Sequence, residues 1–268
     1  MSRRHGFMIM VLGMVLGWCV AISVSVPNVS AGEVVIAAAS DLNFAFKEII
    51  AEFEQTTGHK VKLSLGSSGN FFAQIQNGAP YDLYFSADIR YPQKLVETGH
   101  AVADSLSRYA IGRIVLWVPN SSPLKIEQRG LEALLDPAAK KIAIANPKHA
   151  PYGRAAVSAM EHYAIHEAVK GRLVLGENIS QAAQFVESGA ADAGIIALSL
   201  VLAPPMKAAG RYWEIPADAH PPIEQGAAML TGGRNQENAK AFLLFIQGAE
   251  GQTIMTRYGF VVPSVGHR

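Results

Sequence analysis

The chain has 268 residues, of which 50% are apolar and 17% are charged, with 23 Lys and Arg against 22 Asp and Glu. A disordered chain or a coiled coil is excluded, because the first has fewer apolar residues and the second more charged ones. The net charge of +1 leaves no basic excess, so we expect no nucleic-acid partner.

Residues 1–31 have the pattern of a secretory signal peptide. Two arginines precede a mostly apolar run over 7–26, and small residues follow at 29–31. We therefore expect cleavage after Ala31 and export to the periplasm. The alternative is an uncleaved membrane anchor, because about 20 apolar residues can just span a bilayer. The one cysteine, Cys19, lies within this segment, so the mature chain has no thiol for a disulfide or a metal site.

Short apolar runs and helical periodicities alternate through the rest of the chain. Strands are predicted at 34–38, 61–65, 83–86, 113–118, 141–145, 173–176, 193–197, 212–215 and 226–230. Helices are predicted at 41–57, 71–77, 92–98, 153–163, 180–188, 237–247 and 251–258. Gly58 and Gly99 directly follow two of these helices, as glycines that end helices do.

This alternation predicts an α/β fold in which mostly parallel sheets are flanked by helices. The pattern restarts after the strand at 113–118, which indicates two lobes. No low-complexity linker separates the two runs, so we expect a hinge made of strands that cross between the lobes. Lobe one is predicted to comprise 32–112 plus 222–268, and lobe two 113–221, with the ligand in the cleft between them.

Four junctions between a strand and the following helix carry small and polar residues. They lie at 37–41, 65–70, 145–153 and 176–180. Ligands of open parallel sheets bind beyond the carboxyl ends of the strands, where the first N–H groups of a helix lack partners and favour an anion. The four junctions together predict a small-anion site made of uncharged donors, although each one alone is also explained as an ordinary helix cap.

Five segments carry a resemblance to a known family. They are Ala-Ala-Ala-Ser-Asp-Leu at 37–42, Gly-Ser-Ser-Gly at 66–69, Gly-Ala-Pro-Tyr-Asp-Leu-Tyr-Phe-Ser-Ala-Asp at 78–88, Asn-Pro-Lys-His-Ala-Pro-Tyr-Gly at 146–153, and Gly-Gln through Arg-Tyr-Gly-Phe at 251–260. The chain resembles the periplasmic molybdate-binding proteins of ABC importers, which have the two-lobed type II periplasmic-binding-protein fold. The resemblance implies a monomer that captures molybdate or tungstate for a membrane permease, with no cofactor and no enzymatic activity.

The resemblance also implies which residues hold the oxyanion. It assigns ligand contacts to the hydroxyl and the N–H of Ser40 and Ser68, and to the backbone N–H of Tyr152 and Ile179. These four residues would bind molybdate or tungstate as an intact anion.

Three further positions belong to the expected site. Ala197 stands where some members of the family have a tyrosine hydroxyl, so a donor is missing there or is replaced. We expect Tyr152 or Asn178 to replace it. Asp41 falls in the first turn of a predicted helix, where its carboxylate favours the helix dipole and can point away from a dianion, while its N–H can still face the ligand.

Other readings of the sequence stay open. A protein that binds sulfate or phosphate would have the same architecture, and a protonated phosphate would need a buried acceptor such as Asp41. A hydrolase is disfavoured, because Gly66-Ser67-Ser68-Gly69-Asn70 departs from the nucleophile-elbow pattern by ending in Asn. His162 and His166 have a spacing that can bind zinc, but a solvated helix face is the simpler explanation.

Overall fold

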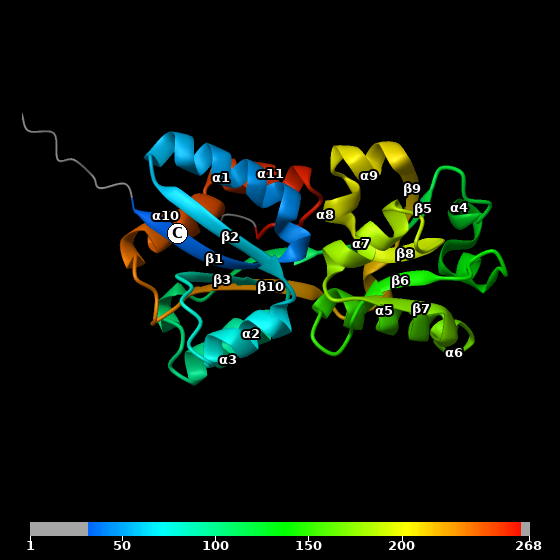
Figure 1. The fold of residues 1–268 in the computed structure, drawn as a ribbon, viewed down its shortest axis with the longest axis horizontal. Helices are drawn as coiled ribbons and strands as arrows, with labels where there is room; N and C mark the ends of the chain where they lie inside the picture. The colour runs from blue at the N-terminus through cyan, green and yellow to red at the C-terminus, as the bar shows by residue number, and fades with distance from the viewer. Residues whose placement is uncertain (1–31, 264–268) are drawn as a thin grey trace, which may run out of the picture. The chain divides into compact units, whose positions relative to one another are not determined.

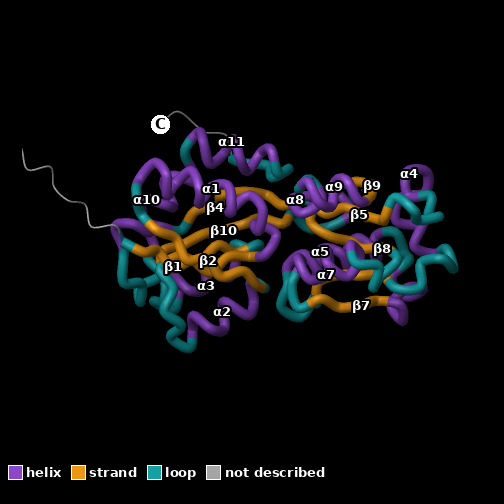
Figure 2. The backbone as a smooth tube through the Cα atoms, turned by 45° about the horizontal axis from the view of Figure 1, so that its top comes forward, coloured by secondary structure: helices purple, strands orange, loops and turns teal. Residues whose placement is uncertain are grey.

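Two five-stranded sheets organise residues 32–263, the part of the chain that the computed structural model describes (Figure 1). Strands lie inside each lobe and helices cover them (Figure 2). The two-lobed α/β fold predicted from the sequence is therefore confirmed. The predicted signal peptide, 1–31, lies outside the described residues. Within them, no helix combines the length and the apolar character needed to cross a bilayer.

The first sheet has the strand order β2-β1-β3-β10-β4. Its strands are β1 (Glu33–Ala39), β2 (Lys60–Gly66), β3 (Leu83–Ser86), β4 (Ser107–Gly112) and β10 (Ile223–Met229). Strand β1 pairs in parallel with β2 and β3, whereas β10 is antiparallel to β3 and β4. All strands except β10 therefore run in one direction.

Helices pack on both faces of this sheet (Figure 1). One face carries α1 (Asn43–Thr57), α10 (Gln236–Gln247) and α11 (Ala249–Arg257), and the other carries α2 (Ser68–Gln76) and α3 (Arg90–Glu97). Phe46 and Phe53 of α1 are buried against Phe242 of α10, with ring centroids 5.9 and 5.0 Å apart. The rings meet edge to face, an arrangement that adds to the stabilisation from burial alone.

The second sheet has the strand order β7-β6-β8-β5-β9. Its strands are β5 (Ile114–Pro119), β6 (Ile142–Ala145), β7 (Leu173–Gly176), β8 (Ala193–Ala197) and β9 (Gly210–Glu214). Strands β6, β7 and β8 are parallel, and β5 is antiparallel to β8 and β9. The helices of this lobe are α4 (Ile126–Arg129), α5 (Pro151–His162), α6 (His166–Val169), α7 (Ile179–Glu187), α8 (Leu198–Val201) and α9 (Pro204–Ala209).

Each sheet is thus mostly parallel in strand direction, with one reversed strand, β10 or β5. The chain leaves the first sheet at the end of β4, enters the second at β5 after Arg113 alone, and returns between β9 and β10. The outward connection is therefore one residue between two strands, whereas the return passes through a 3-10 turn at Ala217–Ala219. The predicted lobe boundaries at 112–113 and 221–222 stay a prediction.

The structure corrects several predicted elements. Helix α2 begins at Ser68 rather than residue 71, and α5 at Pro151 rather than 153, so both begin at the junctions themselves. The predicted helix at 41–57 is wrong at its start, because Ser40–Leu42 forms a separate 3-10 turn before α1. Strand β4 was not predicted, since its sequence Ser-Arg-Tyr-Ala-Ile-Gly lacks the alternation of apolar and polar residues that marks a half-buried strand.

Candidate functional site

A small cavity lies where the carboxyl ends of strands from both sheets meet. Its walls come from 39–41 after β1, 66–68 after β2, Ala87 after β3, 150–152 after β6, and Ile179 after β7. This is the position at which open parallel sheets bind ligands. No lysine or arginine is among the described residues that line it.

The residues predicted from the sequence are mostly brought together at this cavity. Ser40, Ser68, Tyr152 and Ile179 line it, and so does Asp41. Asn178 and Ala197 are not among its lining residues. Whether these residues contact a ligand stays a prediction.

Three helices begin at residues that line the cavity. Ser68 is the first residue of α2, Tyr152 the second of α5, and Ile179 the first of α7. Backbone N–H groups at these positions have no acceptor within their own helix. Among the described residues, no other group accepts a hydrogen bond from these three N–H groups. They also lie at the positive ends of three helix dipoles, which favours an anion.

The hydroxyl of Ser68 adds a fourth donor. Its Oγ accepts a hydrogen bond from the N–H of Ala87 at 3.0 Å, and only 1% of the residue is exposed. The hydroxyl proton has no acceptor among the described residues. A serine held by one bond with its proton unused is suited to bind an acceptor in the cavity.

The Ser40 hydroxyl has a different role in this structure, because it joins the two lobes. It donates to Oδ1 of Asn178 at 3.1 Å and accepts from the N–H of Ser180 at 3.2 Å. Ser180 in turn donates its hydroxyl to the carbonyl of Ser40 at 2.8 Å. Asn178 is the N-cap of α7 and accepts from the N–H of Gln181. The Oδ1 atom of Asn178 is therefore committed to capping and to Ser40.

Tyr152 also differs from the expectation that its hydroxyl replaces the missing tyrosine donor. The hydroxyl donates to Oδ2 of Asp41 at 2.9 Å instead. Gln225 donates to the same carboxylate oxygen at 2.7 Å, and Tyr109 donates to Oε1 of Gln225 at 2.7 Å. The nearby carboxylate is the stronger acceptor, so the Tyr152 hydroxyl is committed to Asp41 in this arrangement, and its replacement of the missing donor stays a prediction.

This buried network links four elements from the two lobes. Asp41, Tyr109, Tyr152 and Gln225 are each less than 5% exposed. Gly112 makes room for it, because a Cβ at this residue would lie 2.2 Å from the Tyr152 hydroxyl oxygen. Burial raises the pKa of Asp41 to about 6, although the hydrogen bonds from Gln225 and Tyr152 act in the opposite direction. Sequence reasoning missed Gln225 and Tyr109, which belong to no local motif.

Contacts at the rim of the cavity hold the lobes together on one side. The N–H of Gly69 and the hydroxyl of Ser67 both donate to the carbonyl of His149, at 2.9 and 2.7 Å. Asn70 donates to the carboxylate of Glu177 at 2.6 Å. These bonds join the N-cap and the first turn of α2 to the second lobe, so the described arrangement is a closed one.

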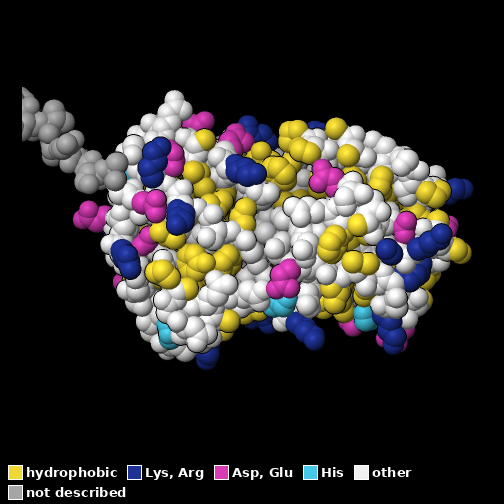
Figure 3. Space-filling view, viewed as in Figure 1, with side chains coloured by type: hydrophobic (Ala, Val, Ile, Leu, Met, Phe, Trp, Pro, Cys, Tyr) yellow, Lys and Arg dark blue, Asp and Glu magenta, His cyan; other side chains and the backbone are white. Residues whose placement is uncertain are grey.

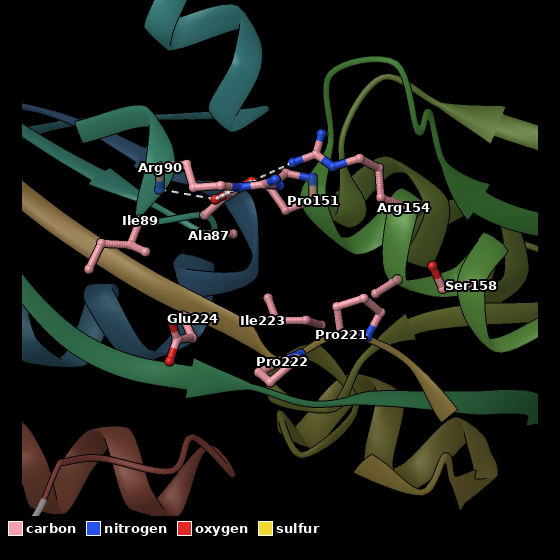
Figure 4. Close-up of a pocket in the computed structure, with 12 residues that line it drawn as sticks. Ala87, Ile89, Arg90, Pro151, Arg154, Ser158, Pro221, Pro222, Ile223 and Glu224 are labelled. Atoms are coloured by element: carbon pink, nitrogen blue, oxygen red, sulfur yellow. Dashed lines mark hydrogen bonds and ion pairs between the residues drawn. The ribbon is translucent and has the colours of Figure 1, made fainter. Parts of the chain in front are cut away.

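A second interlobe contact crosses a larger, adjacent cleft, which shares Ala87 and Pro151 with the small cavity (Figure 4). The cleft has a volume of about 390 Å³. Arg154 of α5 reaches across it to Asp88 at 2.7 Å, and Arg90 binds the same carboxylate from within the first lobe.

On the face drawn in Figure 3, basic and acidic side chains are interspersed rather than gathered by sign.

The histidine pair considered as a zinc site does not share one helix. Helix α5 ends at His162 and α6 begins at His166, with Ala164 in the left-handed region at φ 52° between them. Within 32–263 there is no group of three or more His, Cys, Asp or Glu side chains arranged to hold a metal ion.

Comparisons with known proteins find relatives along most of the chain. The profile described as bacterial extracellular solute-binding protein matches residues 34–261. The molybdate-binding protein ModA of Azotobacter vinelandii is 40% identical over 230 residues, covering 86% of this chain and 90% of that protein. The molybdate-binding protein ModA of Rhodobacter capsulatus is 40% identical over 232 residues, covering 87% and 89%. The solved Azotobacter vinelandii periplasmic molybdate-binding protein matches with a TM-score of 0.81 at 34% identity, covering 86% of this chain and 100% of that one.

Proposed function

Since the chain belongs to the bacterial extracellular solute-binding proteins, we propose that it captures molybdate or tungstate between its lobes and delivers the anion to an ABC transporter permease. Relatives named as molybdate-binding proteins, at 40% identity, support molybdate as the ligand. Tungstate has the same tetrahedral shape and charge, so the same donors suit it.

One observation carries the proposal: unused donors surround a cavity with no basic side chain among the described residues that line it. The N–H groups of Ser68, Tyr152 and Ile179 and the hydroxyl of Ser68 come from three different junctions. Hydrogen bonds from uncharged donors to an ionised acceptor are short and strong in a buried site. A tetrahedral dianion has enough acceptor oxygens for all of them.

The proposed mechanism is closure of the two lobes around the anion. Ser68 and the residues after β1 lie in the lobe of the first sheet, whereas Tyr152 and Ile179 lie in the lobe of the second. An anion that meets one lobe first therefore has only part of its donor shell. Closure adds the remaining donors and excludes water, and the permease then recognises the closed form.

We also propose how the chain is divided into lobes and where it acts. We assign 32–112 plus 222–268 to the lobe of the first sheet and 113–221 to the lobe of the second. The protein acts as a monomer in the periplasm, exported by the signal peptide at 1–31. It binds and releases its ligand unchanged, with no catalytic residue and no cofactor.

A thermal-shift panel tests the ligand class. We expect molybdate and tungstate to raise the melting temperature, since ligand at 100 times its Kd stabilises the folded state by about 2.7 kcal/mol. For a chain of this size the rise is roughly 5–10 °C. Sulfate, phosphate and chromate belong in the same panel. A response to none of the five anions contradicts the proposal, and a response to sulfate alone changes the ligand.

Substituting Ser68 by alanine tests the donor set. We expect Ser68→Ala to weaken molybdate binding by about 2 kcal/mol, roughly 30-fold, because a hydrogen bond to a charged group is lost. Isothermal titration calorimetry measures the change. Ser105→Ala is the matched control, since Ser105 also accepts a backbone N–H, that of Met229, but does not line the cavity. Equal affinity losses in the two variants would show that Ser68 acts only through folding.

A further inference from the structure

Asp41 is the one acidic side chain among the described residues that line the cavity. We propose that this site binds a fully deprotonated oxyanion together with one proton, which Asp41 carries as a neutral carboxylic acid. The inference rests on the proposed function, because it concerns the same anion. Asp41 then selects between anions according to whether they carry a proton.

The two oxygens of the Asp41 carboxyl group have different surroundings. Oδ2 accepts hydrogen bonds from Tyr152 and Gln225. Oδ1 is buried and has no hydrogen-bond partner among the described residues. An ionised carboxylate with a bare, buried oxygen is unfavourable. A proton on Oδ1 makes that atom a donor, and an oxyanion supplies the acceptor that the protein does not.

The ionised form of Asp41 is also incompatible with a dianion in the same cavity. No ion pair or hydrogen bond joins Asp41 to a Lys, Arg or His side chain of the described residues. The repulsion between the carboxylate and the ligand would therefore go uncompensated in a medium that screens charge poorly. Neutralising Asp41 removes this repulsion.

Among the described residues, the groups packed around Asp41 supply no positive charge that could balance an ionised carboxylate. Tyr152 faces it from α5, and Tyr109 of β4 reaches it through Gln225 of β10. Ser199 of α8 donates its hydroxyl to the Asp41 carbonyl. Burial raises the pKa of both tyrosines, so both stay neutral phenols. Burial also raises the pKa of Asp41 to about 6, and a dianion beside it raises the pKa further.

The direction in which affinity changes with pH follows from the higher pKa of Asp41 in the complex. A group whose pKa is higher in the complex than in the free protein takes up a proton on binding. Affinity is therefore greatest below about pH 6, and it falls as the pH rises above the pKa of Asp41 in the free protein. Molybdate, tungstate and sulfate carry no proton at neutral pH, so each must bind with one proton from solvent. Dihydrogen phosphate is a monoanion with protons of its own, so it can donate a hydrogen bond to ionised Asp41.

Calorimetry on the full folded protein tests the inference. Molybdate is titrated between about pH 6.5 and 8.5 in buffers of different ionisation enthalpy, which reports the protons taken up per anion. We expect uptake to approach one proton at the alkaline end, with Kd rising about tenfold per pH unit. Absence of proton uptake, with binding intact, overturns this inference and leaves the proposed function standing. Absence of binding to every anion overturns the proposed function.

Asp41→Asn is the matched variant, because an amide is neutral at every pH and keeps both an acceptor and a donor. Its carbonyl oxygen can accept from Tyr152 and Gln225 as Oδ2 does. We expect the variant to bind molybdate with no proton uptake and with a Kd independent of pH. A variant with the wild-type pH profile contradicts the assignment to Asp41. If Asp41→Asn does not fold, the proton count on the unsubstituted protein still decides.

Discussion

Gly69→Ala is expected to weaken molybdate binding by more than about 3 kcal/mol, at least 100-fold, while the empty protein stays folded. In the closed arrangement a Cβ at residue 69 would lie 2.7 Å from the carbonyl oxygen of His149 and 3.0 Å from its Cα. Both atoms are backbone of the opposite lobe and cannot rotate away. Separation of the lobes is the simplest relief, and it removes half of the proposed donors.

The same substitution is favourable for the local helix. Gly69 is the second residue of α2, where alanine has the higher helix propensity. Thermal unfolding without ligand should therefore change little. Gly171→Ala is the control, because a Cβ there meets nothing within 4 Å. Calorimetry gives Kd, and small-angle scattering with and without molybdate reports closure. A Gly69→Ala protein that compacts and binds as the unsubstituted one does would contradict this mechanism.

Arg154→Glu is expected to weaken molybdate binding by about 3 kcal/mol, roughly 100-fold, mainly through faster release. Arg154 and Asp88 form an ion pair across the cleft at 2.7 Å, and their side chains are 34% and 11% exposed. Losing a partly exposed pair alone is worth only about 1 kcal/mol. The larger effect comes from placing two carboxylates together, which repels the lobes whenever they close.

Asp88 is suited to this contact because it stays ionised. Burial acts to raise the pKa of Asp88, but hydrogen bonds and charge from Arg90, together with the charge of Arg154, lower it overall. Arg154 also lies over the ring of Tyr91, 5.8 Å from its centroid, which orients the guanidinium. Neither residue lines the anion cavity, so the contact acts on closure and not on the ligand.

Two variants separate closure from a general charge effect. Arg90→Ala removes the other arginine bound to Asp88, but that pair lies within one lobe, so release should be near the unsubstituted rate. Arg154→Lys keeps the charge and should retain most of the affinity. Stopped-flow fluorescence measures the release rate, and added salt should reduce the difference between Arg154→Glu and the unsubstituted protein. Equal release rates in Arg154→Glu and Arg90→Ala contradict the role in closure.

The predicted elements that agree best with the structure are those in which a change of residue type marks the boundary. Strands β3, β7 and β8 have the predicted bounds, because a charged residue (Asp82, Arg172 or Asp192) directly precedes each short apolar run. The starts of α2 and α5 were placed too late, since Ser68-Gly69-Asn70 and Pro151-Tyr152 lack apolar periodicity. Those first turns carry the proposed donors.

The sequence by itself determined the α/β alternation, the two runs that became two sheets, and the polar junctions at the strand ends. These depend on local periodicity and on residue types that begin helices, which a single chain displays directly. Only the tertiary structure decided what each polar group is bound to. Gln225 lies 184 residues from Asp41, and Tyr152 lies 111 residues from it. Gln225 meets Asp41 only through the folding of the first lobe, and Tyr152 meets it only where the two lobes contact each other. Hydrogen bonding follows distance in space and leaves no period in the sequence.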